Sequence, residues 1–165
     1  MAEVAELVDA VLGAGDYETL PFSQLLASSP LGDECEQDLR ISAAIETLQA
    51  QRVFITDYPA EQAALARLRP ENPSVAARFE MVVNGVELAN GYHELGDPAQ
   101  LRARFAADND QRQAMGKPVL ALDHAFLAAM AAGLPDCAGV ALGVDRLVML
   151  ALASGRLQDV LTFVD

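Results

Sequence analysis

Basic residues, cysteines and aromatic side chains are all scarce in this sequence. Its 165 residues contain 11 Lys and Arg against 24 Asp and Glu, so the formal net charge is −13. An acidic field repels phosphate backbones, which disfavours direct tRNA or DNA binding and favours cationic partners. The only two cysteines, Cys35 and Cys137, lie outside any CxxC motif, so we expect neither a zinc site nor a disulfide framework and interpret both as buried or idle.

Long hydrophobic runs are absent as well. The richest apolar stretch, AFLAAMAAGLPDCAGVALGV, is broken by Pro135 and Asp136, and no basic leader precedes an apolar segment at the N-terminus. We therefore expect a soluble, cytoplasmic protein with no membrane partner. Hydrophobic residues make up 52% of the chain, enough for one core, so residues 1–165 are expected to form a single domain.

The hydrophobic spacing alternates between helical and strand periods without forming an internal repeat. Helical spacing covers 2–12, 36–51, 98–116, 122–133 and 145–155, and strand-like runs cover 52–59, 77–83, 86–91 and 139–144. Asp97 and Pro98 are a typical helix start. The segment 17–35 is rich in Pro, Ser and Gly and is expected to be a loop with at most one short turn. Because βαβ alternation is rare, we expect an α+β fold with an antiparallel sheet flanked by helices.

The pair Asn84-Gly85 between two strand-like runs predicts a two-residue hairpin loop. The pairs expected from such a loop are Val83 with Val86, Val82 with Glu87, and Met81 with Leu88. Glu80 then shares a face with Val82 and lies diagonal to Glu87, about 7–8 Å away between backbones. Two carboxylates this close favour a shared proton or a cation between them, and Mg²⁺ is commonly held by one or two carboxylates together with substrate phosphates. Two solvated surface glutamates are the alternative.

Strict alternation from Glu87 would place Asn90 on the opposite face of the hairpin. Gly91 offers room for a β-bulge that would redirect Asn90 and Glu94 toward the carboxylates.

The segment GVALGVDRLVML contains a second candidate site. Asp145 is expected to cap the following helix, which places Arg146 in its first turn. A cation there is unfavourable unless an anion binds, and free amides with a guanidinium form a phosphate site. Gly143 would let a flat ligand approach the backbone. An ordinary cap with a solvent-facing arginine is the alternative, but together with the carboxylate pair the motif favours a nucleotide with its metal.

The stretches RFEMVVNGVELANGYHEL and GVALGVDRLVMLALA resemble the C-terminal part of the catalytic domain of class II lysyl-tRNA synthetases, from about Phe54 to Phe163. The ALGVDR form resembles class II motif 3. Within this group, these stretches are most similar to the paralogues that attach β-lysine to elongation factor P. Ala89 and Ala141 stand where ordinary lysyl enzymes usually carry glycine, and His93 stands where they carry serine.

The resemblance implies an ATP and Mg²⁺ site and a partial class II synthetase fold. Glu80 and Glu87 match the carboxylates that hold magnesium against the ATP phosphates. Arg146 matches the arginine that clamps the γ-phosphate, with Gly143 beside the nucleotide. Glu87 and Arg146 are therefore the candidate catalytic residues.

The resemblance also implies an amino-acid site for lysine or β-lysine, with elongation factor P as the acyl acceptor. Glu87 and Asn90 match residues that face the substrate, and Tyr92 matches an aromatic lining its side-chain pocket. Glu94 matches the carboxylate that receives the distal ammonium, and Ala141 borders the same pocket. The implied reaction is adenylation followed by transfer of the acyl group.

Motif 1, motif 2 and an anticodon-binding barrel are not found, and the stretch between the first helix and RVFITDYP looks shorter than is usual in this family. We therefore expect a fragment or a truncated relative that does not adenylate alone and that self-associates or pairs with a missing half. The alternatives are a fragment of a true lysyl-tRNA synthetase, a non-catalytic module that binds a lysine-like amino acid or a protein, and a structural remnant.

Overall fold

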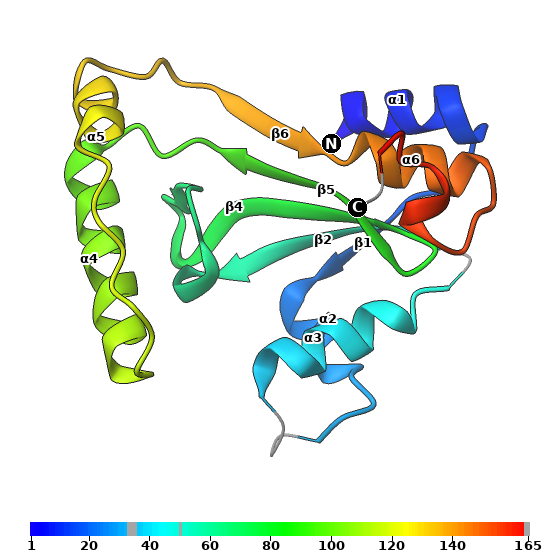
Figure 1. Ribbon diagram of the computed structural model, residues 1–165, viewed down its shortest axis with the longest axis horizontal. Helices are drawn as coiled ribbons and strands as arrows, with labels where there is room; N and C mark the ends of the chain where they lie inside the picture. Colours follow the sequence, from blue (N-terminus) through cyan, green and yellow to red (C-terminus); the bar gives the residue numbers. More distant parts are fainter. Residues whose placement is uncertain (33–35, 50, 164–165) are drawn as a thin grey trace.

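A six-stranded sheet forms the centre of the computed structural model, which describes residues 1–32, 36–49 and 51–163 (Figure 1). The strands are β1 (Glu18–Pro21), β2 (Arg52–Pro59), β3 (Leu68–Arg69), β4 (Asn72–Val83), β5 (Val86–His93) and β6 (Ala138–Leu142). They are ordered β1-β2-β4-β5-β6, and β3 pairs with β4 beside this path. All pairs are antiparallel except β1 with β2, which is parallel. The expected α+β class is confirmed.

Helices cover both faces of this sheet (Figure 1). They are α1 (Ala2–Leu12), α2 (Phe22–Ala27), α3 (Gln37–Glu46), α4 (Pro98–Ala114), α5 (His124–Ala131) and α6 (Val144–Ala151), with short 3₁₀ turns at Ala60–Gln62 and Leu157–Asp159. Helices α1 and α6 pack on one face, α2 and α3 on the other, and α4 and α5 pack together beside the sheet.

The alternation of side chains along β2 explains the two hydrophobic layers. Val53 and Ile55 point toward α2 and α3, where they pack with Leu25. Phe54 points to the other face and packs with α1 and α6. Because both faces are covered, β2 is buried without a break from Val53 to Thr56, as expected for a strand packed on both sides.

The expected loop at 17–35 is wrong over its first half. Glu18–Pro21 forms β1, and Phe22–Ala27 forms α2. Local composition favours a loop, but parallel pairing of β1 with β2 and complete burial of Leu25 override it, because tertiary contacts contribute more than local propensity. The remainder of that stretch includes Cys35, which lies outside the described residues. Cys137 is half-buried rather than fully buried.

Helix boundaries agree with the sequence at α4, where Asp97 caps the helix by accepting from the backbone amides of Ala99 and Gln100. At α6 the expected cap is wrong. Gly143 occupies the N-cap position and Asp145 lies within the first turn, without a side-chain capping hydrogen bond. The Gly143 amide donates to the Leu88 carbonyl at 2.9 Å, so the pairing with β5 continues up to the residue directly before the helix. Over the described ranges, no helix has the length and apolar character that a membrane crossing requires.

Candidate active site

The β4–β5 hairpin carries a β-bulge at Leu88. Val83 pairs with Val86 and Val82 with Glu87, as expected, but Met81 pairs with Ala89 and not with Leu88. The bulge was expected at Gly91. Gly91 instead leaves space for the Phe79 ring, because a Cβ at this position would overlap that ring.

The bulge decides which side chains share a face. Because Leu88 is the extra residue, Asn90 lies directly opposite Glu80 and on the same face as Glu87. Glu80 is two residues from Val82, the partner of Glu87, so the diagonal relation expected between the two carboxylates is present. Ala141 of β6 pairs with Asn90 and joins the same face.

Arg78 contacts both Glu80 and Asn90 on this face, and it was not predicted from the sequence. Its Nη2 lies 2.5 Å from Glu80 Oε1, and its Nε donates to Asn90 Oδ1 at 3.3 Å. Asn90 Nδ2 also donates to Glu80 Oε1 at 3.2 Å. The position two residues before Glu80 on the same strand was the available signal, because such residues share a face.

Two aromatic rings enclose the Arg78 guanidinium. Its central carbon lies 4.2 Å from the centroid of the Tyr58 ring and 5.8 Å from that of Tyr92. The Tyr58 hydroxyl is buried and has no hydrogen-bond partner in the described part of the chain. Burial raises the pKa of Tyr58, and the negative charge of Glu80 raises it further. Tyr58 therefore stays protonated and can donate a hydrogen bond.

A cavity of about 610 Å³ opens in front of this cluster. Its walls include Arg78 and Glu80 from the sheet, Asp38 from α3, and Arg104 and Asp108 from α4. Arg104 Nη1 donates to the carbonyls of Ala64 and Ala66, each at 2.7 Å, whereas the described polar partners of Glu80 are Arg78 and Asn90. The cavity combines a polar floor with charged walls of both signs.

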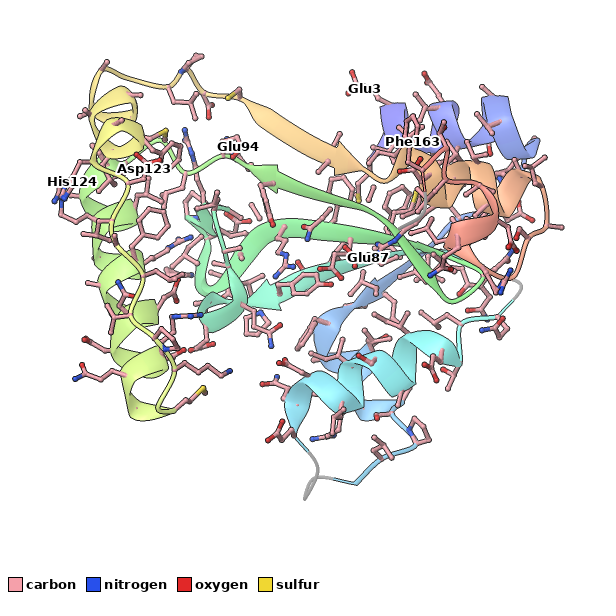
Figure 2. All side chains as sticks on the ribbon, viewed as in Figure 1. Glu3, Glu87, Glu94, Asp123, His124 and Phe163 are labelled. Carbon is pink, nitrogen blue, oxygen red and sulfur yellow. The ribbon has the colours of Figure 1, made fainter. Side chains whose placement is uncertain are left out.

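Glu94 lies just beyond the end of β5, while Glu87 lies near its start (Figure 2). The Glu94 carboxylate rests against the backbone of Gly139, where any Cβ would overlap it. A second cavity of about 390 Å³ adjoins Glu94 and is lined mainly by apolar side chains, including Leu101, Phe126, Met130 and Leu134. A carboxylate in the lining of a mainly apolar cavity suits a ligand with an aliphatic chain and an ammonium group.

Arg67 fixes the backbone of Glu94 by a hydrogen bond. Arg67 Nε donates to the Glu94 carbonyl at 2.6 Å, and its Nη1 forms an ion pair with Asp136 at 3.1 Å. His93 Nε2 also lies 2.6 Å from Asp136. The His93 hydrogen bond and the charge of Arg67 both lower the pKa of Asp136.

Arg146 lies beside Glu87, as the motif suggested. Its Nη1 donates to the Glu87 carbonyl at 2.7 Å and lies 3.6 Å from Glu87 Oε2. Both side chains are about half exposed, so a ligand can reach them. A Cβ on Gly143 would make only ordinary contacts of 3.4–3.6 Å with Arg146, so the fold itself does not require glycine at this position.

The donor set suits a hard cation only if a ligand completes it. Glu80 and Glu87 offer carboxylate oxygens, which Mg²⁺ prefers. Within the described ranges, however, no group of three or more His, Cys, Asp or Glu side chains could hold a metal ion alone. The remaining ligands would therefore have to be phosphate oxygens and water, the usual arrangement for Mg²⁺ with a nucleotide.

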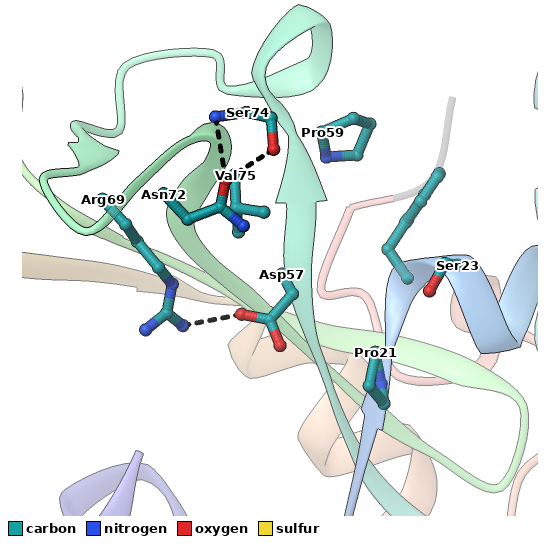
Figure 3. Close-up of a pocket in the computed structure, with 9 residues that line it drawn as sticks. Pro21, Ser23, Asp57, Pro59, Arg69, Asn72, Ser74 and Val75 are labelled. Atoms are coloured by element: carbon teal, nitrogen blue, oxygen red, sulfur yellow. Dashed lines mark hydrogen bonds and ion pairs between the residues drawn. The ribbon is translucent and has the colours of Figure 1, made fainter.

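Another cavity, of about 500 Å³, lies near the end of β2 (Figure 3). An ion pair between Arg69 Nη2 and Asp57 Oδ1 at 2.8 Å forms one wall. None of the residues predicted from the sequence lines it. Glu80, Glu87, Asn90, Tyr92 and Ala141 lie instead on one face of β4, β5 and β6. Gly143 and Arg146 lie at the start of α6, and Glu94 lies beyond the end of β5.

The chain is similar in sequence to known class II tRNA synthetases and their relatives. Residues 5–165 match the family described as tRNA synthetases class II (D, K and N). The chain is 38% identical over 193 aligned positions to the elongation factor P–(R)-β-lysine ligase of Vibrio cholerae serotype O1, covering 99% of this chain and 60% of the relative. It is 48% identical to the same ligase of Vibrio parahaemolyticus over the same shares. For the ligase of Proteus mirabilis the identity is 56% over 110 residues, covering 67% of this chain and 34% of the relative.

The chain thus spans about 60% of the length of the Vibrio relatives. Their alignments have 193 positions although this chain has 165 residues, so the relatives carry additional residues within the matched region. A family match over nearly the whole sequence leaves one conclusion: this chain belongs to the class II tRNA synthetases of the D, K and N group.

Proposed function

We propose that this chain forms part of an ATP-dependent ligase that activates lysine or β-lysine and transfers it to elongation factor P. The observation that carries the proposal is the joint orientation of Glu80, Glu87 and Asn90 on one face, with Glu94 just beyond the end of β5 in the lining of a mainly apolar cavity. Two carboxylates suit a metal-bound nucleotide, and a third, separate carboxylate suits a distal ammonium. The names of the relatives provide the acceptor and the choice of amino acid.

In the proposed reaction a substrate carboxylate oxygen attacks the α-phosphorus of ATP, and pyrophosphate leaves. An amine of the acceptor then attacks the acyl carbon, and AMP leaves. Glu80 and Glu87 would hold Mg²⁺ against the phosphates, where the ion neutralises their charge. Arg146 would bind the γ-phosphate, beside Gly143. Asn90, Tyr92 and Ala141 would orient the amino acid, and Glu94 would select its ammonium. Catalysis of this kind depends mainly on positioning and electrostatic stabilisation.

The test compares calorimetric titrations of lysine, β-lysine and norleucine into this chain, with and without Mg²⁺ and ATP. Lysine-like ligands should bind and norleucine should not. Norleucine lacks the distal ammonium, so it would desolvate the Glu94 carboxylate without pairing with it. Removing one partner of a fully buried ion pair costs about 3–5 kcal/mol. Glu94→Gln should remove the discrimination. Equal binding of lysine and norleucine would contradict the proposed site.

A second candidate function is a non-catalytic module that binds the same amino acid. Its motivation is that motif 2, which the resemblance implies would place an arginine at the α-phosphate, is not found among these 165 residues. Loss of one preorganised group of this kind costs about 10²–10³ in rate. Pyrophosphate exchange separates the two functions: binding of lysine without exchange supports the module, and exchange above background supports the enzyme.

A further inference from the structure

Arg78 contacts four different segments of the proposed site. It is only 14% exposed and pairs with Glu80, which is 12% exposed. Nη1 donates to the Gln62 carbonyl at 2.6 Å, and Nε donates to Asn90 at 3.3 Å. The guanidinium also packs against the ring of Tyr58. A single side chain therefore links the 3₁₀ turn, β2, β4 and β5.

These contacts use properties that only arginine has. A planar guanidinium can stack on an aromatic ring while donating hydrogen bonds in its own plane, whereas a lysine ammonium is a compact point charge. Lys at position 78 could neutralise Glu80, but it could not reach Glu80, Asn90 and Gln62 together. The identity of the residue, and not only its charge, is what the geometry requires.

The key feature is that Glu80 Oε1 accepts two hydrogen bonds. One comes from Arg78 Nη2, and the other comes from Asn90 Nδ2 at 3.2 Å. A cation that approaches this oxygen competes with both donors. When Glu80 turns to a cation, the Asn90 amide loses its acceptor and becomes available to another ligand, while Arg78 still holds Asn90 through Oδ1.

We infer that Arg78 is a positioning residue that couples the metal–nucleotide half of the site, at Glu80, to the amino-acid half, at Asn90. The inference rests on the proposed function for the identity of the two ligands. Binding of Mg²⁺ with nucleotide releases the Asn90 amide from Glu80, and so raises the affinity for the amino acid. By linkage, the amino acid raises the affinity for the nucleotide by the same factor.

The experiment is a binding cycle on the 165-residue chain, measured by calorimetry with lysine and with Mg²⁺ plus a non-hydrolysable ATP analogue. Lysine should bind at least about fivefold more tightly when the nucleotide is present, the lower end of ordinary coupling. In Arg78→Lys this ratio should fall to about one, even where each ligand still binds. Arg104→Lys is the matched control, because Arg104 lines the same cavity without contacting Glu80, and it should keep the ratio. A ratio in Arg78→Lys equal to that of the unmodified chain would overturn the inference.

A second measurement needs no ligand and so separates this inference from the proposed function. The Asn90 side-chain amide signals in a ¹H–¹⁵N spectrum should shift in Arg78→Lys and in Glu80→Gln, and should stay in place in Arg104→Lys. If Arg78→Lys does not fold, Glu80→Gln breaks the same pair from the other side. Unmoved Asn90 signals in the folded variants would overturn the positioning role. Failure of the unmodified chain to bind lysine or nucleotide, with shifted Asn90 signals, would overturn the proposed function and the coupling but leave the hydrogen-bond network in place.

Discussion

Asn90 lies directly opposite Glu80, and its side-chain amide donates to Glu80 Oε1 at 3.2 Å. This contact exists only because Leu88 bulges out of the pairing between β4 and β5. Without the bulge, Asn90 would point to the α1 and α6 side of the sheet, since alternate residues of a strand face opposite ways. One inserted residue therefore brings Asn90, the candidate ligand of the amino acid, to the face that carries the candidate metal ligands Glu80 and Glu87.

Replacing Glu87 by Gln should weaken Mg²⁺-dependent ATP binding by about tenfold or more. The substitution keeps the shape of the side chain but removes a charged oxygen ligand, and a charged hydrogen-bond or metal partner contributes more than about 1.4 kcal/mol. Calorimetric titration of ATP with and without Mg²⁺ measures the effect. Glu71→Gln is the control, because Glu71 is an exposed carboxylate away from this site. Its Oε1 lies 3.8 Å from Arg69 Nη1. Unchanged Mg²⁺ dependence in Glu87→Gln would refute the metal assignment.

Replacing Gly139 by Ala should displace the Glu94 carboxylate without unfolding the protein. The added Cβ would overlap the end of a flexible side chain, which can rotate away. Lysine affinity should then fall by about tenfold while the melting temperature changes little. Gly155→Ala, which meets nothing within 4 Å, controls for adding a methyl group. Full lysine affinity in Gly139→Ala would show that Glu94 does not select the ligand from its observed position.

Alanine at two other glycines should affect different properties, nucleotide binding at Gly143 and stability at Gly91. Gly143→Ala meets only ordinary contacts with Arg146, so the melting temperature should be unchanged, while nucleotide binding should weaken if a ligand approaches that backbone. Gly91→Ala should instead destabilise the fold by about 1–3 kcal/mol, because the Cβ would overlap the Phe79 ring. Thermal unfolding and ATP titration of both variants separate the two effects. Normal nucleotide binding in Gly143→Ala would mean that the nucleotide does not pass close to this residue.

Asp136 should make a contribution to stability that depends on pH. Its pKa is lowered in the folded protein by His93 and Arg67, so the contribution is present above the unfolded pKa of about 3.9 and is lost as the pH falls through the lower, folded value. Comparison of Asp136→Asn with the unmodified chain should thus show a small difference in melting temperature at pH 6 that disappears in strong acid. A difference that grows on acidification would have the wrong sign for this network.

The purified chain should self-associate through the edge at β6 and the adjoining face of α6. Strand β6 ends the described sheet, and Val140, Val144, Val148 and Leu152 are all exposed there. Open edges and apolar patches of this kind favour association. Light scattering should report more than a monomer, and Val144→Glu should shift the distribution toward monomer. Leu39→Glu, at an exposed leucine on α3, should not. A monomer at high protein concentration would contradict the expectation.

Several features of this molecule could be predicted from local sequence. Asn84-Gly85 predicts the hairpin because few residues other than Asn and Gly tolerate the positive φ angles that both adopt here. Asp97 and Pro98 predict the start of α4 through capping and a fixed φ angle. The diagonal placement of Glu80 and Glu87 follows from the hairpin loop alone. All of these depend on interactions within a few residues.

Other features required contacts between segments far apart in the chain. β1 and α2 were missed because their order comes from pairing with β2 and from burial of Leu25. The bulge lies at Leu88, where the side chain is buried among α1 and α6 residues, and not at Gly91, which lacks a side chain. The role of Arg78 appears only once Tyr58, Gln62 and Asn90 surround it. The sequence by itself therefore determined most of the helices and strands and the types of chemistry available, since these depend on local propensity and residue identity. The tertiary structure alone decided which side chains meet, because strand register and burial are set by packing across the whole sheet.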